Sequence, residues 1–319
     1  MQMVDNARVV VYLVNGFLEA GKTQFLNQTL EQEYFRVDGK TVLIRLEEGE
    51  EEYDENLLKR TNTILMTVDS PEELTKDFLN GIDILYNPER VIFECNGMYP
   101  VSKMEVLDVP KGWGLVQEIT IVDATTFDMY VTNMKSLFAD MVRNAELVIF
   151  NRCDESMPLA KYRRNVKAVN QGAEIVFEGE DGAIENIFTD EMPYDLKAPI
   201  VQIDDMDFGI WYIDMIDHPK TYNKKKVEFR GKVLKSLSLS KDEVVVGRKA
   251  MTCCEDDLTF LGYICKGIPM DMVKAGQWVK VTGEVGFAFK RAYGGRGPVI
   301  KVESWEVVDA PKEELVYFN

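Results

Sequence analysis

The chain has 319 residues, of which 46% are hydrophobic and 29% charged, and a formal net charge of −17 at pH 7. This length allows a sizeable core and predicts two domains, and the composition is that of a soluble globular protein. No apolar run approaches the roughly 20 residues that a membrane span needs, and residues 1–8 lack a signal-peptide pattern. We therefore expect a cytoplasmic protein without membrane insertion.

The charge is unevenly distributed along the chain. Residues 224–319 carry 17 Lys and Arg against 13 Asp and Glu, whereas residues 1–223 carry 20 and 41. The acidic part is a poor candidate for nucleic-acid binding through bulk electrostatics, and the mildly basic part leaves that function open. The five cysteines are an odd number scattered along a long chain, which indicates reduced thiols rather than a disulfide framework.

The strongest motif follows the first predicted strand, residues 8–14. The sequence Gly-Phe-Leu-Glu-Ala-Gly-Lys-Thr at 16–23 matches a phosphate-binding loop, and a helix is predicted over 21–33. Glycines let such a loop wrap a phosphate at the positive end of a helix, the lysine reaches the β- and γ-phosphates, and the threonine hydroxyl binds Mg²⁺. The residues expected to bind the nucleotide here are Gly16, Glu19, Ala20, Gly21, Lys22, Thr23 and Gln24.

Strands and helices alternate from this loop to about residue 177. A helix is predicted to start at Ser70 and to run to about Tyr86, and another is predicted over 155–170. Further strands are predicted over 41–46, 62–68, 90–94, 116–122, 147–150 and 173–177. The alternation predicts an α/β fold, a doubly wound and mostly parallel sheet with helices on both faces.

Three acidic or polar features follow strand ends in this part of the chain. Residues 47–55 hold seven carboxylates and form either a switch segment near Mg²⁺ or, as the sequence alone favours, a solvated acidic loop. Glu94 ends the strand over 90–94, where a carboxylate near a phosphate loop holds Mg²⁺ or orients water. Asn151, Arg152 and Asp154 form an Asn-x-x-Asp motif after a buried strand, the arrangement that reads guanine through the Asp carboxylate.

The sequence changes character near residue 195. A connector over 198–226 contains a short helix at 210–216, and from there strands alternate apolar with polar residues. The five predicted strands cover 227–234, 243–252, 258–265, 277–289 and 298–308. They suggest a small closed barrel of the oligonucleotide/oligosaccharide-binding (OB) type, and the predicted domains are 1–197 and 227–319.

The motifs of the N-terminal part, in their order, resemble the CobW-like GTPases, a P-loop family associated with metal homeostasis and cobalamin biosynthesis. The resemblance covers about residues 9–177 and implies GTP and Mg²⁺ as ligands. The family's Asn-Glu-Phe-Gly-Glu segment is similar to residues 46–50, which implies a metal-binding role for Glu50, and its Glu-x-x-Gly and Val-Asp-Ala motifs match 94–97 and 122–124. Glu19 stands where the family usually has glycine, and Arg152 where it has lysine.

The resemblance fails at two places. The family's Cys-x-Cys-Cys metal motif is absent from residues 55–74, so Zn²⁺ or another transition metal would need other ligands. The C-terminal part instead resembles the C-terminal domain of an uncharacterised permease-associated bacterial family. Its thiols, Cys253, Cys254 and Cys265, are either a metal or redox site or, more commonly for such residues, buried side chains of a narrow barrel.

We therefore expect a GTP-binding protein with slow Mg²⁺-dependent hydrolysis, on the order of 10⁻⁴ to 10⁻² per second. Lys22 and Glu94 would act in catalysis, Thr23, Glu94 and Glu50 would bind metal, and the partner would be an unknown protein or metalloprotein client, with a nucleotide-dependent dimer as a further option. Two alternatives remain: a nucleotide sensor without turnover, and a barrel that binds a protein or single-stranded nucleic acid. The nucleic-acid alternative would use Lys224, Lys225, Lys226, Lys290, Arg291 and Arg296 with Phe229, Phe287 and Tyr293.

Overall fold

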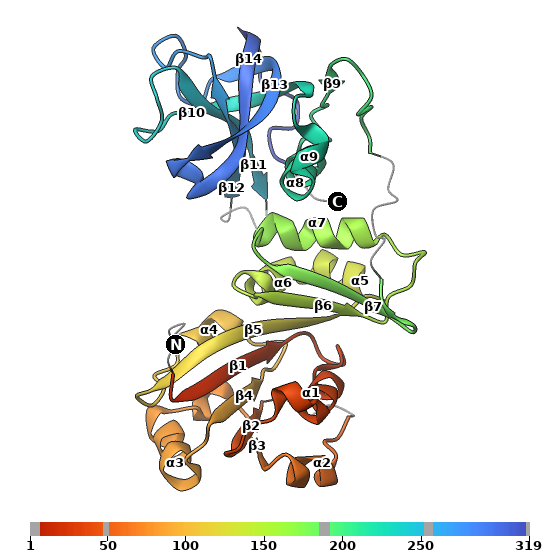
Figure 1. Ribbon diagram of the computed structural model, residues 1–319, viewed down its shortest axis with the longest axis vertical. Coiled ribbons are helices and arrows are strands. Elements are labelled where there is room, and N and C mark those ends of the chain that lie inside the picture. The colour runs from red at the N-terminus through yellow and green to blue at the C-terminus, as the bar shows by residue number, and fades with distance from the viewer. Residues whose placement is uncertain (1–6, 47–50, 185–191, 252–257, 317–319) are drawn as a thin grey trace. The chain divides into compact units, whose positions relative to one another are not determined.

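The computed structural model describes residues 7–46, 51–184, 192–251 and 258–316 (Figure 1). The chain divides into two compact units, Met1–Ile187 and Phe188–Asn319. The stretch predicted as a connector belongs to the second unit, where it forms β9 (Val201–Gln202), α8 (Phe208–Asp217) and α9 (Pro219–Tyr222). Among the described helices, none has the length and apolar character that would let it cross a membrane.

The first unit is built on one eight-stranded sheet with the order β3-β2-β4-β1-β5-β6-β7-β8. All neighbouring pairs from β3 to β7 are parallel, and β8 joins β7 in antiparallel orientation. The strands are β1 (Val9–Asn15), β2 (Thr41–Arg45), β3 (Thr63–Thr67), β4 (Arg90–Glu94), β5 (Trp113–Asp123), β6 (Leu147–Asn151), β7 (Glu174–Gly179) and β8 (Gly182–Ala183). The predicted mostly parallel α/β sheet is confirmed.

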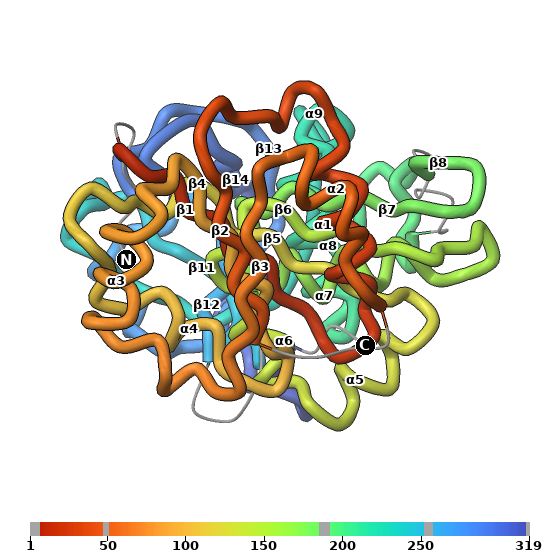
Figure 2. The backbone as a smooth tube through the Cα atoms, turned by 90° about the horizontal axis from the view of Figure 1, so that it is seen from below, coloured from red at the N-terminus to blue at the C-terminus, as the bar shows by residue number. Residues whose placement is uncertain are grey.

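Helices cover both faces of this sheet, because its buried strands point apolar residues to either side. Leu26 of α1 and Leu57 of α2 belong to one core cluster, and Leu79 of α3 and Met104 of α4 belong to the other. Figure 2 shows α1 and α2 on one side of the strands and α3 and α4 on the opposite side. The helices are α1 (Lys22–Glu31), α2 (Glu55–Arg60), α3 (Lys76–Tyr86), α4 (Val101–Glu105), α5 (Phe127–Asn133), α6 (Lys135–Val142) and α7 (Leu159–Val169).

Two predicted helix starts are wrong. Ser70 caps only a short 3₁₀ helix, Pro71–Glu73, and α3 begins at Lys76, where the Thr75 hydroxyl accepts the Phe78 N–H at 3.2 Å. The helix predicted from residue 155 begins at Leu159, directly after Pro158. Proline disfavours helical geometry in the residue before it and favours the first helical turn, so a helix starts more readily after Pro158 than before it.

The second unit contains the predicted five-stranded barrel. Around it the strands follow the order β10-β11-β12-β14-β13, and a further pairing between β10 and β11 closes the ring. Neighbouring strands are antiparallel except β12 and β14, and β9 adds to β10 in parallel. The barrel strands are β10 (Lys226–Leu234), β11 (Glu243–Met251), β12 (Leu258–Lys266), β13 (Trp278–Lys290) and β14 (Gly295–Val307).

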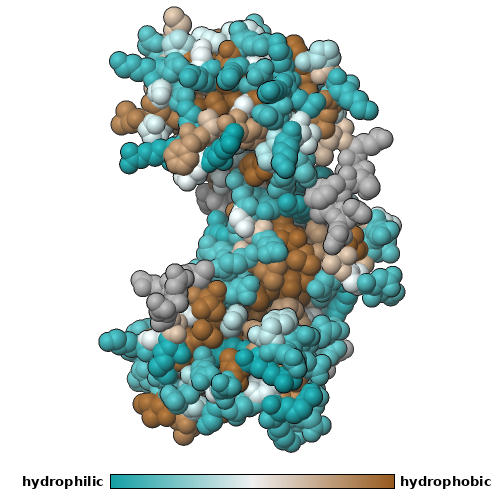
Figure 3. Space-filling view, in the orientation of Figure 1, coloured by the Kyte–Doolittle hydropathy of each residue, from teal (hydrophilic) through white to brown (hydrophobic). Residues whose placement is uncertain are grey.

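Helix α8 packs on the barrel through an aromatic cluster. Trp211 of α8 is fully buried, with its ring 4.8 Å from that of Phe229 and 5.3 Å from that of Tyr263. The Tyr263 hydroxyl donates to the Tyr212 carbonyl at 2.5 Å, which ties the helix to β12. On the face shown in Figure 3, hydrophilic residues cover most of the surface and the hydrophobic areas are smaller.

Candidate functional site

The glycine-containing loop predicted from the sequence joins β1 to α1 at the carboxyl edge of the parallel sheet. Phe17 anchors the loop to α5, because its ring stacks on that of Tyr130 with the centroids 4.1 Å apart. Gly97, of the Glu-x-x-Gly motif, packs closely against the backbone of the loop. A Cβ atom at position 97 would come within 2.2 Å of the Gly16 carbonyl oxygen. Any side chain at position 97 would therefore displace the loop.

Lys22 lies inside this loop. Its side chain is buried, and Nζ donates hydrogen bonds to the carbonyl oxygens of Gly16 and Phe17, both at 2.9 Å. The N-cap of α1 is Gly21, which has no side chain with which to satisfy the N–H groups of the first turn. Uncapped N–H groups at a helix start, beside a lysine, form a site for a bound anion.

The loop conformation explains two residues that differ from the expected pattern. Glu19 has a φ of 59°, in the left-handed region that favours glycine, which accounts for the glycine that the family resemblance leads one to expect there. Arg152 donates to the Glu19 carbonyl at 3.0 Å and pairs with Asp123 at the end of β5. Asn151 Nδ2 donates to the Ala20 carbonyl at 2.7 Å. The ends of β5 and β6 thus hold the loop through its backbone.

The carboxylate of Glu94 forms the second half of the site. Its side chain is buried at the end of β4, the Thr23 hydroxyl donates to Oε1 at 2.6 Å, and the Tyr53 hydroxyl donates to Oε2 at 2.7 Å. Burial, and then the neighbouring Glu94 carboxylate, raise the pKa of Tyr53, so its hydroxyl stays protonated and a donor. Sequence analysis missed Tyr53; its signal was an aromatic residue within a run of carboxylates.

These groups fit a magnesium ion. The Thr23 hydroxyl and the Glu94 carboxylate are the oxygen donors that Mg²⁺ prefers, they lie in direct contact, and Tyr53 orients the second carboxylate oxygen. Glu50, the third predicted metal ligand, lies outside the described residues, as do residues 47–49 of the predicted switch segment. Asp54, just beyond, caps α2 by accepting the Asn56 N–H at 2.8 Å.

Two adjoining cavities lie beside the loop and have room for a nucleoside. The first, of about 340 Å³, is lined by Gly21 and Gln24 on the α1 side and by Asn151 and Arg152 after β6. The second, of about 630 Å³, is lined by Asp154 together with residues 179–184. Gly179 and Glu180 line both, so the segment that follows β7 joins them. Sequence analysis missed this segment, which carries no motif.

Asp154 is exposed at the second cavity, and its side chain is an ionised carboxylate that can accept hydrogen bonds. Its Oδ1 accepts the Ser156 N–H at 2.8 Å, and hydrogen bonds from the Ser156 hydroxyl and then its backbone hold the pKa of Asp154 below its usual value. The group therefore remains a carboxylate at neutral pH. A carboxylate is the acceptor that the N1–H and amino group of guanine require.

The cysteines of the described residues are structural in character. Cys95, Cys153 and Cys265 are buried, and burial raises the pKa of Cys153 to about 11 and that of Cys265 still further. Thiols with raised pKa values are poor sources of the thiolate that binds metals. No group of three or more His, Cys, Asp or Glu side chains within the described ranges is arranged to hold a metal ion, while Cys253 and Cys254 lie outside them.

The residues proposed for nucleic-acid binding are mostly engaged elsewhere. Phe229 is 1% exposed in the barrel core, which leaves no ring face for a base. Lys226 pairs with Glu303, Lys290 with Glu243, and the Lys225 ammonium donates to a backbone carbonyl at 2.8 Å. Phe229 is therefore not available for stacking, and the nucleic-acid alternative stays a prediction for the other residues.

The chain is similar to several proteins of known structure or name. Solved structures include the Zn(II)-bound YjiA GTPase from E. coli, at 17% identity and a TM-score of 0.44 over 93% of this chain and 89% of that one. HypB from Helicobacter pylori in complex with nickel matches at 15% identity and a TM-score of 0.36 over 55% and 80%. The UPF0703 protein YcgQ of Bacillus subtilis (strain 168) is 26% identical over 125 residues, which are 39% of this chain and 43% of YcgQ.

Two family models account for nearly the whole chain. Residues 180–318 match the DUF1980 C-terminal domain, in agreement with the barrel and its helices. Residues 10–177 match the CobW/HypB/UreG nucleotide-binding domain, a range that includes the loop, Glu94 and the Asn-x-x-Asp motif. The chain therefore belongs to the CobW/HypB/UreG nucleotide-binding family and carries a DUF1980 C-terminal domain.

Proposed function

We propose that the protein is a GTP-binding switch that hydrolyses GTP slowly with Mg²⁺. The observation that carries this proposal is the hydrogen bond of 2.6 Å between the Thr23 hydroxyl and the buried Glu94 carboxylate. It joins the start of the loop helix to the end of β4, and Lys22 lies beside it in the same loop. Phosphate-binding and metal-binding groups from distant parts of the sequence are thereby brought together.

The roles of the residues follow from their positions. Lys22 and the backbone of 16–24 bind the phosphates, and Asn151, Arg152 and Asp154 surround the base in the two cavities. Thr23 and Glu94 hold Mg²⁺, which when bound neutralises charge on the phosphates. The Glu94 carboxylate, which Tyr53 orients through a hydrogen bond, would also orient water for hydrolysis.

A role in metal handling rests on family membership. The structures of Zn(II)-bound YjiA and nickel-bound HypB concern those proteins, and the described thiols of this chain are buried apart from any ligand cluster. Of the metal-binding candidates that the sequence offers, Glu50, Cys253 and Cys254 lie outside the described residues. Equilibrium dialysis with Zn²⁺, with and without GTP, measures whether the protein alone binds it.

The experiment that tests the proposed nucleotide is the substitution Asp154→Asn. An asparagine amide donates where the carboxylate accepts, so we expect GTP affinity to fall by about 10- to 100-fold while xanthosine triphosphate is spared. Glu155→Gln, which removes the neighbouring carboxylate of the same cavity, is the matched comparison and should bind GTP normally if Asp154 alone accepts from guanine. Titration with fluorescent GTP, ATP and xanthosine triphosphate analogues measures the affinities of the unmodified protein and both variants.

The outcomes separate the alternatives. Equal affinity of the unmodified protein for GTP and ATP would contradict the guanine assignment and leave an unspecific nucleotide site. Loss of GTP affinity in Glu155→Gln but not in Asp154→Asn would show that the base lies differently in the second cavity. Tight GTP binding without single-turnover hydrolysis would identify a sensor rather than a GTPase.

A further inference from the structure

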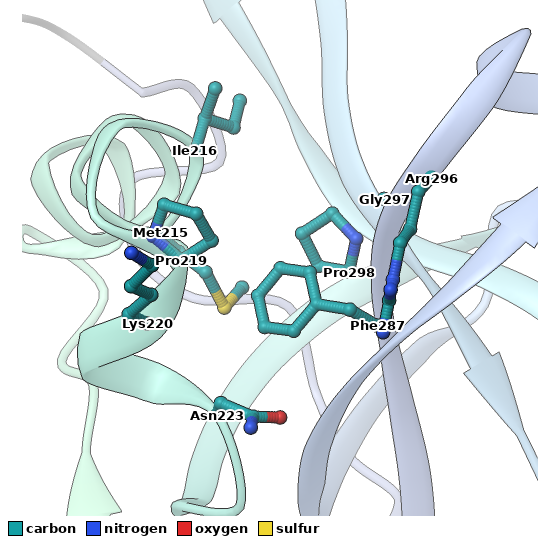
Figure 4. A pocket seen from close by; sticks show the side chains of 9 residues that line it. All are labelled: Met215, Ile216, Pro219, Lys220, Asn223, Phe287, Arg296, Gly297 and Pro298. Carbon is teal, nitrogen blue, oxygen red and sulfur yellow. The ribbon is translucent and has the colours of Figure 1, made fainter.

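A pocket of about 550 Å³ lies in the second unit, between the two helices α8 and α9 and the strands β13 and β14. Figure 4 shows Met215, Pro219 and Lys220 on its helical side and Phe287, Arg296 and Pro298 on its strand side. This volume is within the range of small-molecule sites. Neither the nucleotide site nor the family assignment gives the pocket a role.

Both walls of the pocket are fixed by hydrogen bonds. The turn after α9 is joined to β13 because Lys224 N–H donates to the Val285 carbonyl and Val285 N–H donates to the Lys225 carbonyl, each at 2.8 Å. On the other side, the Tyr293 hydroxyl donates to the Pro298 carbonyl at 3.0 Å. A pocket with fixed walls needs little ordering when a ligand enters, which favours binding.

The interior of the pocket is apolar. Met215 is fully buried and points toward the ring of Phe287, and Pro219 and Pro298 are half-buried on either side (Figure 4). The aromatic ring and the two prolines offer a surface on which a flat or branched apolar group can pack. The exposed amide of Asn223 adds one polar group at the edge.

The charge of the pocket is opposite to that of the chain. Its lining contains the exposed cations Lys220 and Arg296 and no carboxylate, although the chain carries 54 Asp and Glu against 37 Lys and Arg. Several other cations around the barrel differ: Lys226, Arg230 and Lys280 each pair with a carboxylate. For Lys220 and Arg296 the described residues provide no ion pair, so their charges remain available to a ligand.

We propose that this pocket binds a small organic anion with an aromatic or branched apolar body. The body packs against Pro219, Phe287 and Pro298, and the anionic group lies near Lys220 and Arg296. An anionic group attached to an apolar body matches a pocket with an apolar lining and two exposed cations at its edge. The site is independent of the nucleotide site, because all its residues belong to the second unit.

The probe pair for this proposal is 8-anilinonaphthalene-1-sulfonate and N-phenyl-1-naphthylamine, which share the apolar body and differ by the sulfonate. The intact 319-residue chain should bind the sulfonate at one site, at least about tenfold more tightly than the neutral amine, as a charge-assisted contact predicts. Lys220→Glu and Arg296→Glu should each weaken sulfonate binding by about tenfold and leave the amine unchanged. Phe287→Ala should weaken both probes.

Matched controls lie on the same strands. Lys301→Glu makes the same charge change at an exposed position of β14, and Phe289→Ala removes an exposed phenylalanine of β13 that does not line the pocket. Both should bind the probes as the unmodified protein does, and thermal unfolding checks that every variant is folded. Lys22→Ala should also leave sulfonate binding unchanged, which separates this site from the nucleotide site.

Three results would overturn the proposal. Equal binding of both probes would show that the cations do not select an anion. Sulfonate binding that responds to Phe287→Ala but to neither charge reversal would reduce the site to an unselective apolar pocket. Binding that responds to none of the pocket substitutions, or equally to Lys301→Glu, would place the probe elsewhere on the protein.

Discussion

The two units of this protein differ in how their chemistry is arranged along the sequence. In the first unit, the parallel sheet brings the carboxyl ends of β1, β4 and β6 to one edge, so that short motifs at strand ends meet: Thr23 contacts Glu94, and Asn151 contacts the loop. In the second unit, the strands of an antiparallel barrel alternate inward and outward residues and carry no comparable motif. Its pocket forms where helices pack against the outside of the barrel.

The units also differ in the surroundings of a buried glutamate. Glu118 of β5 is 1% exposed and accepts a long hydrogen bond of 3.4 Å from Asn15, and burial raises its pKa to about 8, so it is protonated at neutral pH. In the barrel, the equally buried Glu243 is paired with Lys290. The first unit therefore keeps this buried carboxyl group protonated, whereas the barrel pairs Glu243 with a lysine.

The largest expected effects come from Lys22→Ala and Glu94→Gln, which test whether the first unit alone carries the nucleotide chemistry. Lys22→Ala should lower GTP affinity by about 100-fold, or roughly 3 kcal/mol, because the charged contacts to phosphate are lost. Glu94→Gln should keep affinity within a few-fold but slow single-turnover hydrolysis by at least about tenfold. Fluorescent GTP titration and rapid-quench hydrolysis with Mg²⁺ measure the two effects.

The control for these variants is Lys59→Ala, which removes an exposed lysine of α2 that pairs with Glu55. It should change neither affinity nor hydrolysis. Full hydrolysis by Glu94→Gln would show that the contact between Glu94 and Thr23 has no part in turnover.

The next effect concerns close backbone packing, which occurs in both units. Gly97→Ala should destabilise the first unit by about 2–3 kcal/mol and weaken GTP binding, because its Cβ would lie 2.2 Å from the Gly16 carbonyl. Gly247→Ala should destabilise only the second unit, since its Cβ would lie 2.0 Å from the Leu261 carbonyl. Chemical denaturation followed by fluorescence, together with limited proteolysis, assigns each change to its unit.

Gly81 in α3 provides the opposite control. A Cβ there meets nothing within 4 Å, so Gly81→Ala should stabilise the first unit by about 0.5–1 kcal/mol through helix propensity. If Gly97→Ala were as stable as Gly81→Ala, the tight contact between the loop and the Glu-x-x-Gly motif would not exist in solution.

The buried Glu118 gives the first unit a pH dependence that the paired Glu243 does not lead us to expect in the barrel. Burial, and then the carboxylates of Glu105 and Glu146, raise the pKa of Glu118 from 4.5 to about 8. The folded state thus keeps a proton that the unfolded state has lost, so stability falls as pH rises from about 4.5 to 8, by up to about 1.4 kcal/mol per pH unit. Glu118→Gln cannot ionise and should flatten this slope.

Denaturant unfolding at pH 5.5, 7 and 8.5 measures the effect. Glu174→Gln, at an exposed position of β7, is the control and should keep the slope of the unmodified protein. A slope unchanged by Glu118→Gln would assign the pH dependence to other carboxyl groups.

The smallest effect compares backbone strain in the two units. Glu19 and Lys224 have φ angles of 59° and 67°, so Glu19→Gly and Lys224→Gly should each stabilise the protein by about 0.5–1 kcal/mol. Glu19→Gly should keep GTP affinity within about threefold, because Arg152 contacts the backbone carbonyl of residue 19. Thermal unfolding measures the stability of both variants, and GTP titration measures the affinity of Glu19→Gly. A Glu19→Gly protein less stable than the unmodified one would show that contacts of the Glu19 side chain contribute more free energy than the backbone strain costs.

The sequence by itself determined the local features of this protein. The loop over 16–23 was predicted from residue spacing, the parallel sheet from the alternation of strands and helices, and the five-stranded barrel from apolar and polar alternation. The sequence signals for these features are local. Each lies within one element or one turn, where backbone geometry and residue periodicity act directly. Glu94 was found because it ends a buried strand.

The tertiary structure decided which distant residues meet. Thr23 and Glu94 are 71 positions apart and Tyr53 and Glu94 are 41 apart, so no spacing rule could place Tyr53 on the carboxylate. The segment over 179–184 lines the base cavities only because β7 lies next to β6, and the anion pocket exists only because α8 and α9 pack on β13 and β14. Such contacts depend on how layers pack, which local sequence patterns do not encode.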